Sequence, residues 1–164
     1  MKKTTLYNTH LELNAKMTSF GGFEMPIQYS GVKKEHLTVR SSLGGFDVSH
    51  MGEFYISGSN ALPLLQHICS NDISKIPIGK AQYNYFPNET GGIVDDLIVY
   101  RLDESMYLLV VNASNISKDW DWIQKHNTSY RAELEDRSES TALLAIQGPK
   151  ALQAMQKLTP SRLN

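Results

Sequence analysis

Two adjacent acids, Asp95 and Asp96, stand in a run of apolar residues within the segment NETGGIVDDLIVYR, residues 88–101. The β-branched and aliphatic neighbours predict a buried strand, where a carboxylate is costly unless it is hydrogen-bonded. Because side chains alternate along a strand, the two acids point to opposite faces of the sheet. They cannot form a paired-carboxylate dyad with each other, and only one of them can face a given site.

The face that carries Asp96 could form a binding constellation. The alternation places Ile98 and Tyr100 on the same face as this acid. The next apolar segment, MYLLVVN, predicts a partner strand on which Val110 and Asn112 share a face. In a hairpin of suitable register, an acid, an amide, a phenol and an apolar wall would then lie side by side.

Two simpler interpretations of these acids stay open on the pattern alone. Asp96 could end the turn that follows Gly92 by accepting backbone N–H bonds, as aspartate often does. Asp95 is expected at the surface or in a salt bridge, with Arg101 as a candidate partner.

The other reactive side chains show no catalytic spacing. The five histidines lack the HxH and HExxH patterns, so no metal site is expected. Cys69 in HICS is expected to be a packed core residue and not a nucleophile. His50 in DVSHM is expected to be a structural, hydrogen-bonding histidine. None of the glycine pairs forms a phosphate-binding loop.

The elements that must position these residues alternate irregularly between helix and strand. Helical periodicity marks residues 31–43, 61–70 and 116–126, and a further helix begins at Gly148. Extended segments are expected at 46–59, 81–89, 93–101, 106–112, 130–136 and 142–148. Hairpins and helices on antiparallel sheets predict an α+β fold in the style of a split β-α-β unit. A doubly wound parallel sheet does not fit this order.

Composition narrows the class of protein. The chain has 164 residues, 41% hydrophobic and 20% charged, with a net charge of −1. This balance gives no electrostatic case for nucleic acid or an anionic membrane surface, and no apolar run approaches the roughly 20 residues of a membrane helix. The single cysteine excludes an internal disulfide and fits a reducing compartment, so a cytoplasmic protein is expected.

Several motifs taken together resemble one family. In chain order they are TxLYxxH, GGFEMPIQYS, FDVSHMGE, FPNETGGIVDDLIVYR, YLLVVNASNISKDWDWI and ALLAIQGPKA. FDVSHM and GGIxDDL together are specific to a folate-dependent superfamily, and the match runs through essentially the whole chain. The sequence therefore resembles the T-protein (aminomethyltransferase) family of the glycine cleavage system, in its N-terminal part.

The resemblance implies a reaction of glycine catabolism and one-carbon metabolism. Enzymes of this family transfer the one-carbon unit of an aminomethyl group, held on the lipoyl arm of the H-protein, to tetrahydrofolate. Ammonia is released and 5,10-methylenetetrahydrofolate is formed, with no metal and no covalent enzyme intermediate. Lipoylated H-protein and folate are thus the implied partners, and neither nucleic acid nor a membrane is expected.

The resemblance also implies the site residues. The key aspartate of the family, which holds folate near its reactive nitrogens, falls on the second acid of GGIVDD, here Asp96. The other folate-contacting positions fall on Met51, Tyr83, Ile98, Tyr100, Val110 and Asn112. The resemblance and the strand alternation agree on Asp96, which favours a functional role over the turn-ending one.

The chain departs from the family in length. Family members are more than twice as long, so an N-terminal fragment is expected, without the C-terminal half and its barrel domain. Residues 1–50 and 141–164 would form an incomplete first domain and residues 51–140 a second α+β domain. Three alternatives to the transferase stay open: a folate-dependent demethylase, a non-catalytic folate-binding protein, and a truncated domain that is inactive alone.

Overall fold

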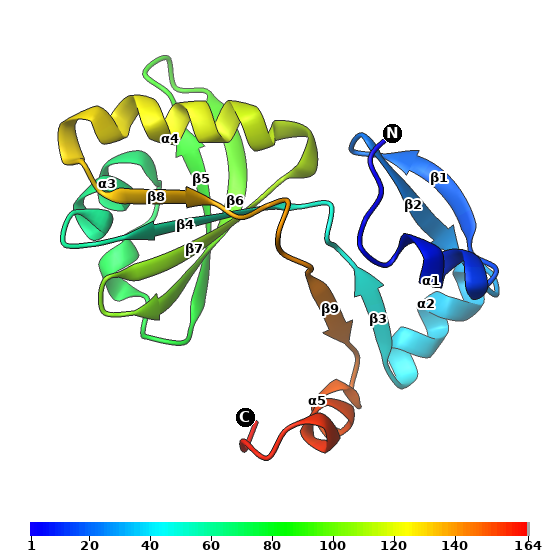
Figure 1. Cartoon of the computed structure of the whole chain (residues 1–164). Helices are drawn as coiled ribbons and strands as arrows, with labels where there is room; N and C mark the ends of the chain where they lie inside the picture. Colours follow the sequence, from blue (N-terminus) through cyan, green and yellow to red (C-terminus); the bar gives the residue numbers. More distant parts are fainter. Residues whose placement is uncertain (164) are drawn as a thin grey trace. The chain divides into compact units, whose positions relative to one another are not determined.

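The computed structural model describes residues 1–163, which divide into two compact units. One unit is formed by Met1–His50 together with the residues from Ala142 onward, and the other by Met51–Thr141. The chain therefore leaves the first unit once, builds the second from one continuous segment, and returns (Figure 1).

The first unit contains two small antiparallel sheets. Its elements are α1 (Tyr7–Glu12), β1 (Lys16–Phe20), β2 (Phe23–Gln28), α2 (Val32–Ser41), β3 (Gly44–Asp47), β9 (Leu144–Gln147), α5 (Ala151–Met155) and the 3-10 turn Gln156–Leu158. Strand β1 pairs with β2, and β3 pairs with β9. The β1–β2 turn consists of Gly21 and Gly22 with φ of 57° and 84°. Two positive φ values in succession suit a tight hairpin and favour glycine at both places.

A buried carboxylate anchors the segment FDVSH, residues 46–50, in this unit. Asp47 accepts hydrogen bonds from Thr4 Oγ1 at 2.7 Å, His10 Nε2 at 2.8 Å and the Ser49 backbone N–H at 3.0 Å. Although burial raises it, the bonds from Thr4 and His10 bring the pKa of Asp47 below its usual value. Tyr29 Oη lies 2.8 Å from His10 Nδ1. The network thus joins α1, β3 and the segment that directly follows β2.

The second unit is a five-stranded antiparallel sheet with two helices. Its elements are β4 (Gly52–Ser57), α3 (Ala61–Ile68), β5 (Ala81–Pro87), β6 (Ile93–Asp103), β7 (Met106–Val111), α4 (Ile116–Tyr130) and β8 (Glu133–Asp136), with 3-10 turns at Ile73–Lys75 and Ala113–Asn115. The strand order is β5-β6-β7-β4-β8 and every neighbouring pair is antiparallel. The predicted α+β class with antiparallel sheets is confirmed.

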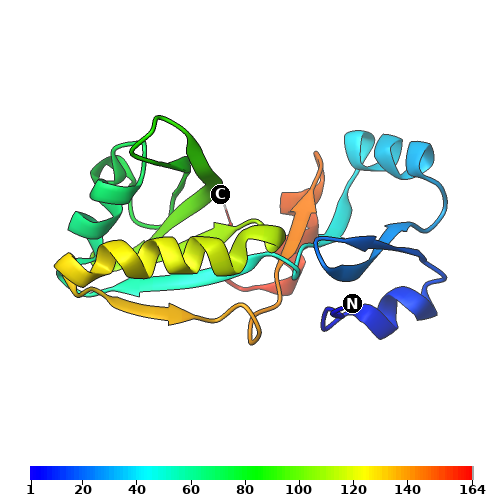
Figure 2. The same ribbon diagram turned by 90° about the horizontal axis from the view of Figure 1, so that it is seen from above.

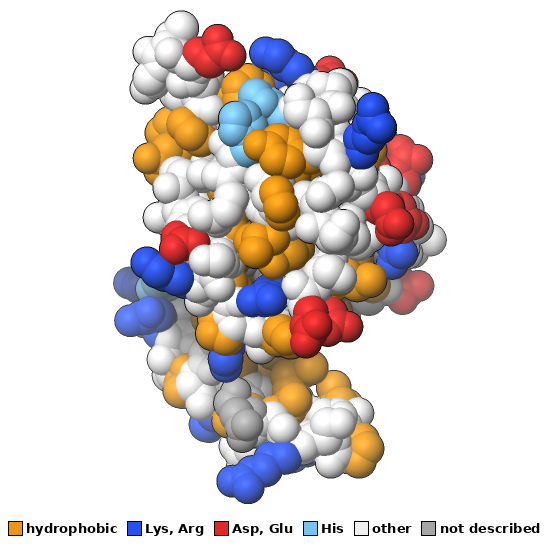
Figure 3. All heavy atoms as spheres, turned by 90° about the vertical axis from the view of Figure 1, so that its left-hand side faces the viewer, with side chains coloured by type: hydrophobic (Ala, Val, Ile, Leu, Met, Phe, Trp, Pro, Cys, Tyr) orange, Lys and Arg blue, Asp and Glu red, His pale blue; other side chains and the backbone are white. Residues whose placement is uncertain are grey.

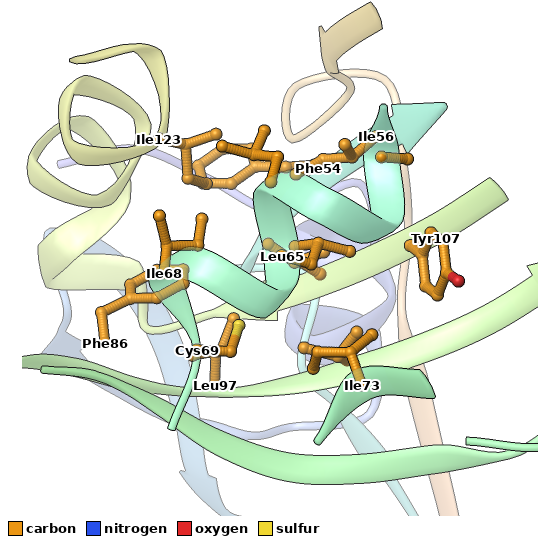
Figure 4. Packing of buried hydrophobic residues seen from close by; sticks show 14 of the residues in the cluster. Phe54, Ile56, Leu65, Ile68, Cys69, Ile73, Phe86, Leu97, Tyr107 and Ile123 are labelled. Atoms are coloured by element: carbon orange, nitrogen blue, oxygen red, sulfur yellow. The ribbon is translucent and has the colours of Figure 1, made fainter. Parts of the chain in front are cut away.

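The hydrophobic core of this unit lies on one face of the sheet, beneath α3 and α4 (Figures 1 and 2). Helix α3 contributes Leu65 and Ile68, and α4 contributes Ile123, all at most 2% exposed. They pack with alternate strand residues such as Phe54 and Leu97, as Figure 4 shows. The opposite face of the strands carries no helix of this unit, and the predicted site residues of β6 and β7 lie on it. We call it the open face.

Gly52 allows helix α4 to approach the sheet. A Cβ built on this glycine would lie 2.7 Å from Ile116 Cγ1 and 2.7 Å from Val111 Cγ2, closer than real Cβ contacts. Any larger residue would push the first turn of α4 away from β4. Glycine here therefore sets the position of the helix start, and with it the residues of that first turn.

The structure differs from the sequence predictions in some local details. The extended segment 46–59 is two strands, β3 and β4, one in each unit. The last helix is short, because α5 ends at Met155 and a 3-10 turn follows. Trp120 and Trp122 of α4 are both partly buried against the core.

Charged side chains of both signs lie on the face shown in Figure 3. Acidic and basic side chains are interspersed in the upper part of the face shown in Figure 3, consistent with the net charge of −1. Among residues 1–163, none of the helices has both the length and the apolar character needed to cross a bilayer.

Candidate functional site

Strand register brings the residues of the open face together. Ile98 of β6 lies opposite Tyr83 of β5 on one side and Val110 of β7 on the other. Leu97 pairs with Val111, which places Asp96 beside Asn112 in the same register. The predicted alternation is confirmed, because Leu97 is 3% exposed on the helix-covered face and Ile98 is 37% exposed on the open face.

Asp96 is held by two side-chain donors. Asn112 Nδ2 donates to its Oδ1 at 3.0 Å, and Tyr83 Oη donates to its Oδ2 at 2.9 Å. The hydrogen bond to Asp96 raises the pKa of Tyr83, so the phenol remains a donor at neutral pH. Asp96 does not serve mainly as a turn residue that accepts backbone N–H bonds. Its carboxylate is oriented by an amide and a phenol.

An apolar and aromatic wall surrounds this carboxylate. Val110 is 5% exposed and Tyr83 is 62% exposed. Tyr100 is half-buried and pairs with Leu108 of β7. A flat, partly apolar ligand with N–H groups could stack on this surface and donate to the carboxylate.

Two further residues belong to the edge of the open face. Met51 directly precedes Gly52, which pairs with Val111, so the backbone of Met51 lies at the same end of the sheet as Asn112. Tyr85, which no sequence argument singled out, pairs directly with Asp96 across β5 and β6. The sequence could have indicated Tyr85, because it lies two residues from Tyr83 and side chains two residues apart on a strand share a face.

The prediction for Asp95 was wrong. Its side chain is only 8% exposed, on the helix-covered face, and it does not pair with Arg101. Arg101 instead donates to the backbone carbonyls of Ile76 and Glu104. Asp95 accepts a 3.0 Å hydrogen bond from Asn112 Nδ2, the same nitrogen that holds Asp96. The two acids face opposite sides but share one amide at the end of the sheet.

Sequence reasoning also missed Asp119, in the first turn of α4. This residue is completely buried and forms a carboxyl–carboxyl contact with Asp95. Burial, the hydrogen bond to Asp95 and the charge of Asp95 raise the pKa of Asp119 to about 8. No sequence pattern marked this residue, because NISKDWDWI contains two acids and the helical period alone does not say which one meets a strand.

Glu53 is a second buried acid that the sequence did not reveal. It pairs with Val110 across β4 and β7, is 0% exposed, and neither carboxyl oxygen has a hydrogen-bond partner among residues 1–163. Burial, with the charge of Asp136, raises its pKa to about 7. The residue sits beside the predicted wall, so its protonation state affects the polarity of that end of the sheet.

The remaining sequence candidates take structural places. Burial raises the pKa of Cys69 to about 12, so this core thiol is no nucleophile. His50 packs edge-on against Phe20 with ring centroids 5.4 Å apart, and its Nδ1 lacks a hydrogen bond to any described residue. The expected hydrogen-bonding role of His50 is therefore wrong for that atom. Within residues 1–163, no group of three or more His, Cys, Asp or Glu side chains is placed to hold a metal ion.

Comparisons with known proteins agree on one group. The chain is 58% identical over 164 residues to an aminomethyltransferase of Phocaeicola vulgatus, covering 100% of this chain and 45% of that protein. It is 54% identical over 159 residues to an aminomethyltransferase of Thermus thermophilus, covering 97% of this chain and 46% of that one. The chain thus spans about half the length of the curated relatives it matches.

A solved structure supports the same grouping. The crystal structure of glycine cleavage system aminomethyltransferase T from Bartonella henselae matches with a TM-score of 0.86 at 36% identity, covering 95% of this chain and 43% of that one. The GCVT N-terminal domain family matches residues 6–164. The chain therefore belongs to the GCVT N-terminal domain family.

Proposed function

We propose that this chain carries the tetrahydrofolate site of an aminomethyltransferase of the glycine cleavage system. The observation that carries the proposal is the doubly held carboxylate of Asp96 on the open face. The two hydrogen bonds fix the orientation of both carboxylate oxygens, which can also accept hydrogen bonds from the N–H groups of a ligand. The names of the relatives, all aminomethyltransferases at 53–58% identity, support the same assignment.

The residues present fit a reduced pterin. Tyr83, Tyr100 and Ile98 offer flat and apolar surface for a ring, and Asp96 offers an acceptor for ring N–H groups. When bound, tetrahydrofolate supplies the nitrogen that accepts the one-carbon unit. The work of the chain itself is to bind and orient this ring, with Met51, Val110 and Asn112 at the edge of the wall, which is catalysis by proximity and electrostatic preorganisation.

The second substrate in this proposal is the aminomethyl-lipoyl arm of the H-protein. Transfer of its one-carbon unit to tetrahydrofolate gives 5,10-methylenetetrahydrofolate, ammonia and the reduced arm. The buried acid Glu53, beside Val110, adds an ionisable group at the same end of the sheet. Because the relatives are about twice as long, binding of folate is a sharper test for this chain than turnover.

Anaerobic isothermal titration of tetrahydrofolate into the chain and into Asp96→Asn tests the proposal. The variant keeps the size of the side chain but loses the anionic acceptor, and hydrogen bonds to charged groups contribute about 1.5–3 kcal/mol. We expect Kd to rise about 10- to 100-fold. Asp103→Asn, at the exposed end of the same strand, is the matched control and should bind like the parent. Equal affinity of Asp96→Asn and parent would refute the role of Asp96.

A further inference from the structure

Three buried carboxylate oxygens meet at the start of helix α4 without a donor. They are Oδ2 of Asp95 and both oxygens of Asp119, and none accepts a hydrogen bond from a donor among residues 1–163. Asp119 is 0% exposed and Asp95 is 8% exposed, so neither carboxyl is solvated in the usual way. Two unpaired charges in such a place would cost several kcal/mol.

A single proton resolves this arrangement. An ionised carboxylate can only accept hydrogen bonds, whereas a protonated one also donates. If Asp119 keeps its proton, its hydroxyl donates to Asp95, and the pair becomes one short, charge-assisted hydrogen bond. The burial and the contact with Asp95 that raise the pKa of Asp119 to about 8 are consistent with this state.

The pair is connected to the candidate site through one side chain. Asn112 Nδ2 donates to Asp95 Oδ1 at 3.0 Å and also to Asp96 Oδ1 at 3.0 Å. It makes a third contact, 3.1 Å, with the backbone oxygen of Asp96. The orientation of Asn112 therefore depends on where the Asp95 carboxylate lies, and the orientation of Asp96 depends on Asn112.

We infer that one proton shared by Asp95 and Asp119 positions Asn112 and, through it, the carboxylate of Asp96. Asp119 is in this view a positioning residue, held over the end of β6 by the first turn of α4. The functional consequence rests on the proposed folate site, but the shared proton and the placement of Asn112 do not. Loss of the proton puts two charges in contact and drives Asp95 or α4 away from Asn112.

The groups that face this pair come from three elements. On α4, Lys118 favours the ionised form of Asp119, and its Nζ donates to the Val94 carbonyl at 2.6 Å. Next to α4, the side chain of Asn115 lowers the pKa of Asp95, as that of Asn112 does. On β6, the charge of Asp96 adds to that of Asp95 and disfavours ionisation of Asp119. Burial and two nearby anions thus outweigh one exposed cation, and Asp119 keeps its proton at neutral pH.

A pH titration followed by NMR tests the inference. The side-chain NδH2 signals of Asn112 and the carboxyl ¹³Cγ signals of the aspartates are recorded between about pH 6 and about pH 10. In the parent, we expect the Asn112 signals and the Asp119 carboxyl to move together with a midpoint of about pH 8. In Asp119→Asn, whose amide donates permanently, the Asn112 signals should resemble those of the parent at neutral pH and not titrate.

Two other variants complete the design. Asp119→Val removes the donor and should displace the Asn112 signals at every pH. Asp121→Asn, an exposed acid on the same helix, removes the same charge and should titrate like the parent. The inference is overturned if Asp119 is already ionised at neutral pH, or if Asn112 does not respond when Asp119 titrates. It is also overturned if Asp119→Asn leaves the Asn112 titration in place, a test that survives any misfolding of the valine variant.

Tetrahydrofolate binding provides a separate arm. Between about pH 7 and about pH 9 the Kd of the parent should rise about tenfold, and that of Asp119→Asn should not, since a misplaced acceptor loses about one hydrogen bond. If binding is absent at every pH while the Asn112 signals titrate as expected, the proposed folate site fails and the shared proton stands. If binding occurs and has the same pH dependence in both proteins, the positioning role is overturned.

Discussion

Replacing Asp119 by asparagine should flatten the pH dependence of stability of the second unit. In the unfolded chain this carboxyl ionises near its ordinary value of 3.8, whereas in the folded chain its pKa is about 8. Between these values the native state holds a proton that the unfolded state lacks. The stability contributed by Asp119 is therefore fully present below about pH 4, falls as pH rises, and is lost above about pH 8.

The structure sets the magnitude. Each pH unit in this window removes about 1.4 kcal/mol, so the interval from about pH 6 to about pH 8 removes at most about 3 kcal/mol. Glu53, with a pKa of about 7, titrates in the same direction, but it is present in both proteins and cancels in the difference. The free energy of unfolding of Asp119→Asn, relative to that of the parent, should therefore increase by up to about 3 kcal/mol from about pH 6 to about pH 8.

Urea denaturation followed by tryptophan fluorescence measures this difference. Both tryptophans, Trp120 and Trp122, lie on α4 and report on the unit that contains the pair. Asp121→Asn, exposed on the same helix, controls for the general loss of one negative charge. A parent curve that runs parallel to that of Asp119→Asn from about pH 6 to about pH 9 would refute the reasoning, because no proton would then be retained on folding.

Three further changes have defined outcomes. Gly52→Ala should destabilise the second unit by about 1–3 kcal/mol in urea, because its Cβ would overlap Ile116 and Val111. The double variant with Ile116→Ala should lose less stability than the sum of the two single variants. Strict additivity of the two losses would count against the overlap. Tyr83→Phe removes one donor to Asp96 and should raise the Kd for tetrahydrofolate about tenfold without changing the melting temperature; an unchanged Kd would show that this bond is not needed. Asp47→Asn should destabilise the first unit by about 3 kcal/mol at neutral pH, since its side chain is 1% exposed and anchors three donors; a change in thermal melting within experimental error would contradict this.

Prediction from the sequence was most accurate where the two-residue alternation of side chains along a strand determines which face they share. Alternation along β6 and β7 placed Asp96, Ile98, Val110 and Asn112 on one face, because a strand with one buried face has little freedom of register. The α+β class followed from the mixture of hairpins and amphipathic helices. Both deductions use only neighbours in sequence.

The contacts of α4 could not be predicted in the same way. Whether Asp119 or another acid of the helix meets β6 depends on the depth to which α4 docks, which Gly52 sets from a strand more than sixty residues away. The error on Asp95 has the same origin. A buried carboxyl was judged too costly at that position, but the cost falls once a second carboxyl shares its proton.

Mapping of tetrahydrofolate onto the chain by NMR tests the central claim most directly. Chemical-shift changes recorded during an anaerobic titration show which face of the second unit binds the ligand. We predict that the largest changes fall on Asp96, Ile98 and Val110 of the open face, with small changes for Val99 and Leu109 on the helix-covered face. Changes that concentrate elsewhere, or no changes in a folded chain, would contradict the assignment of this face as the folate site.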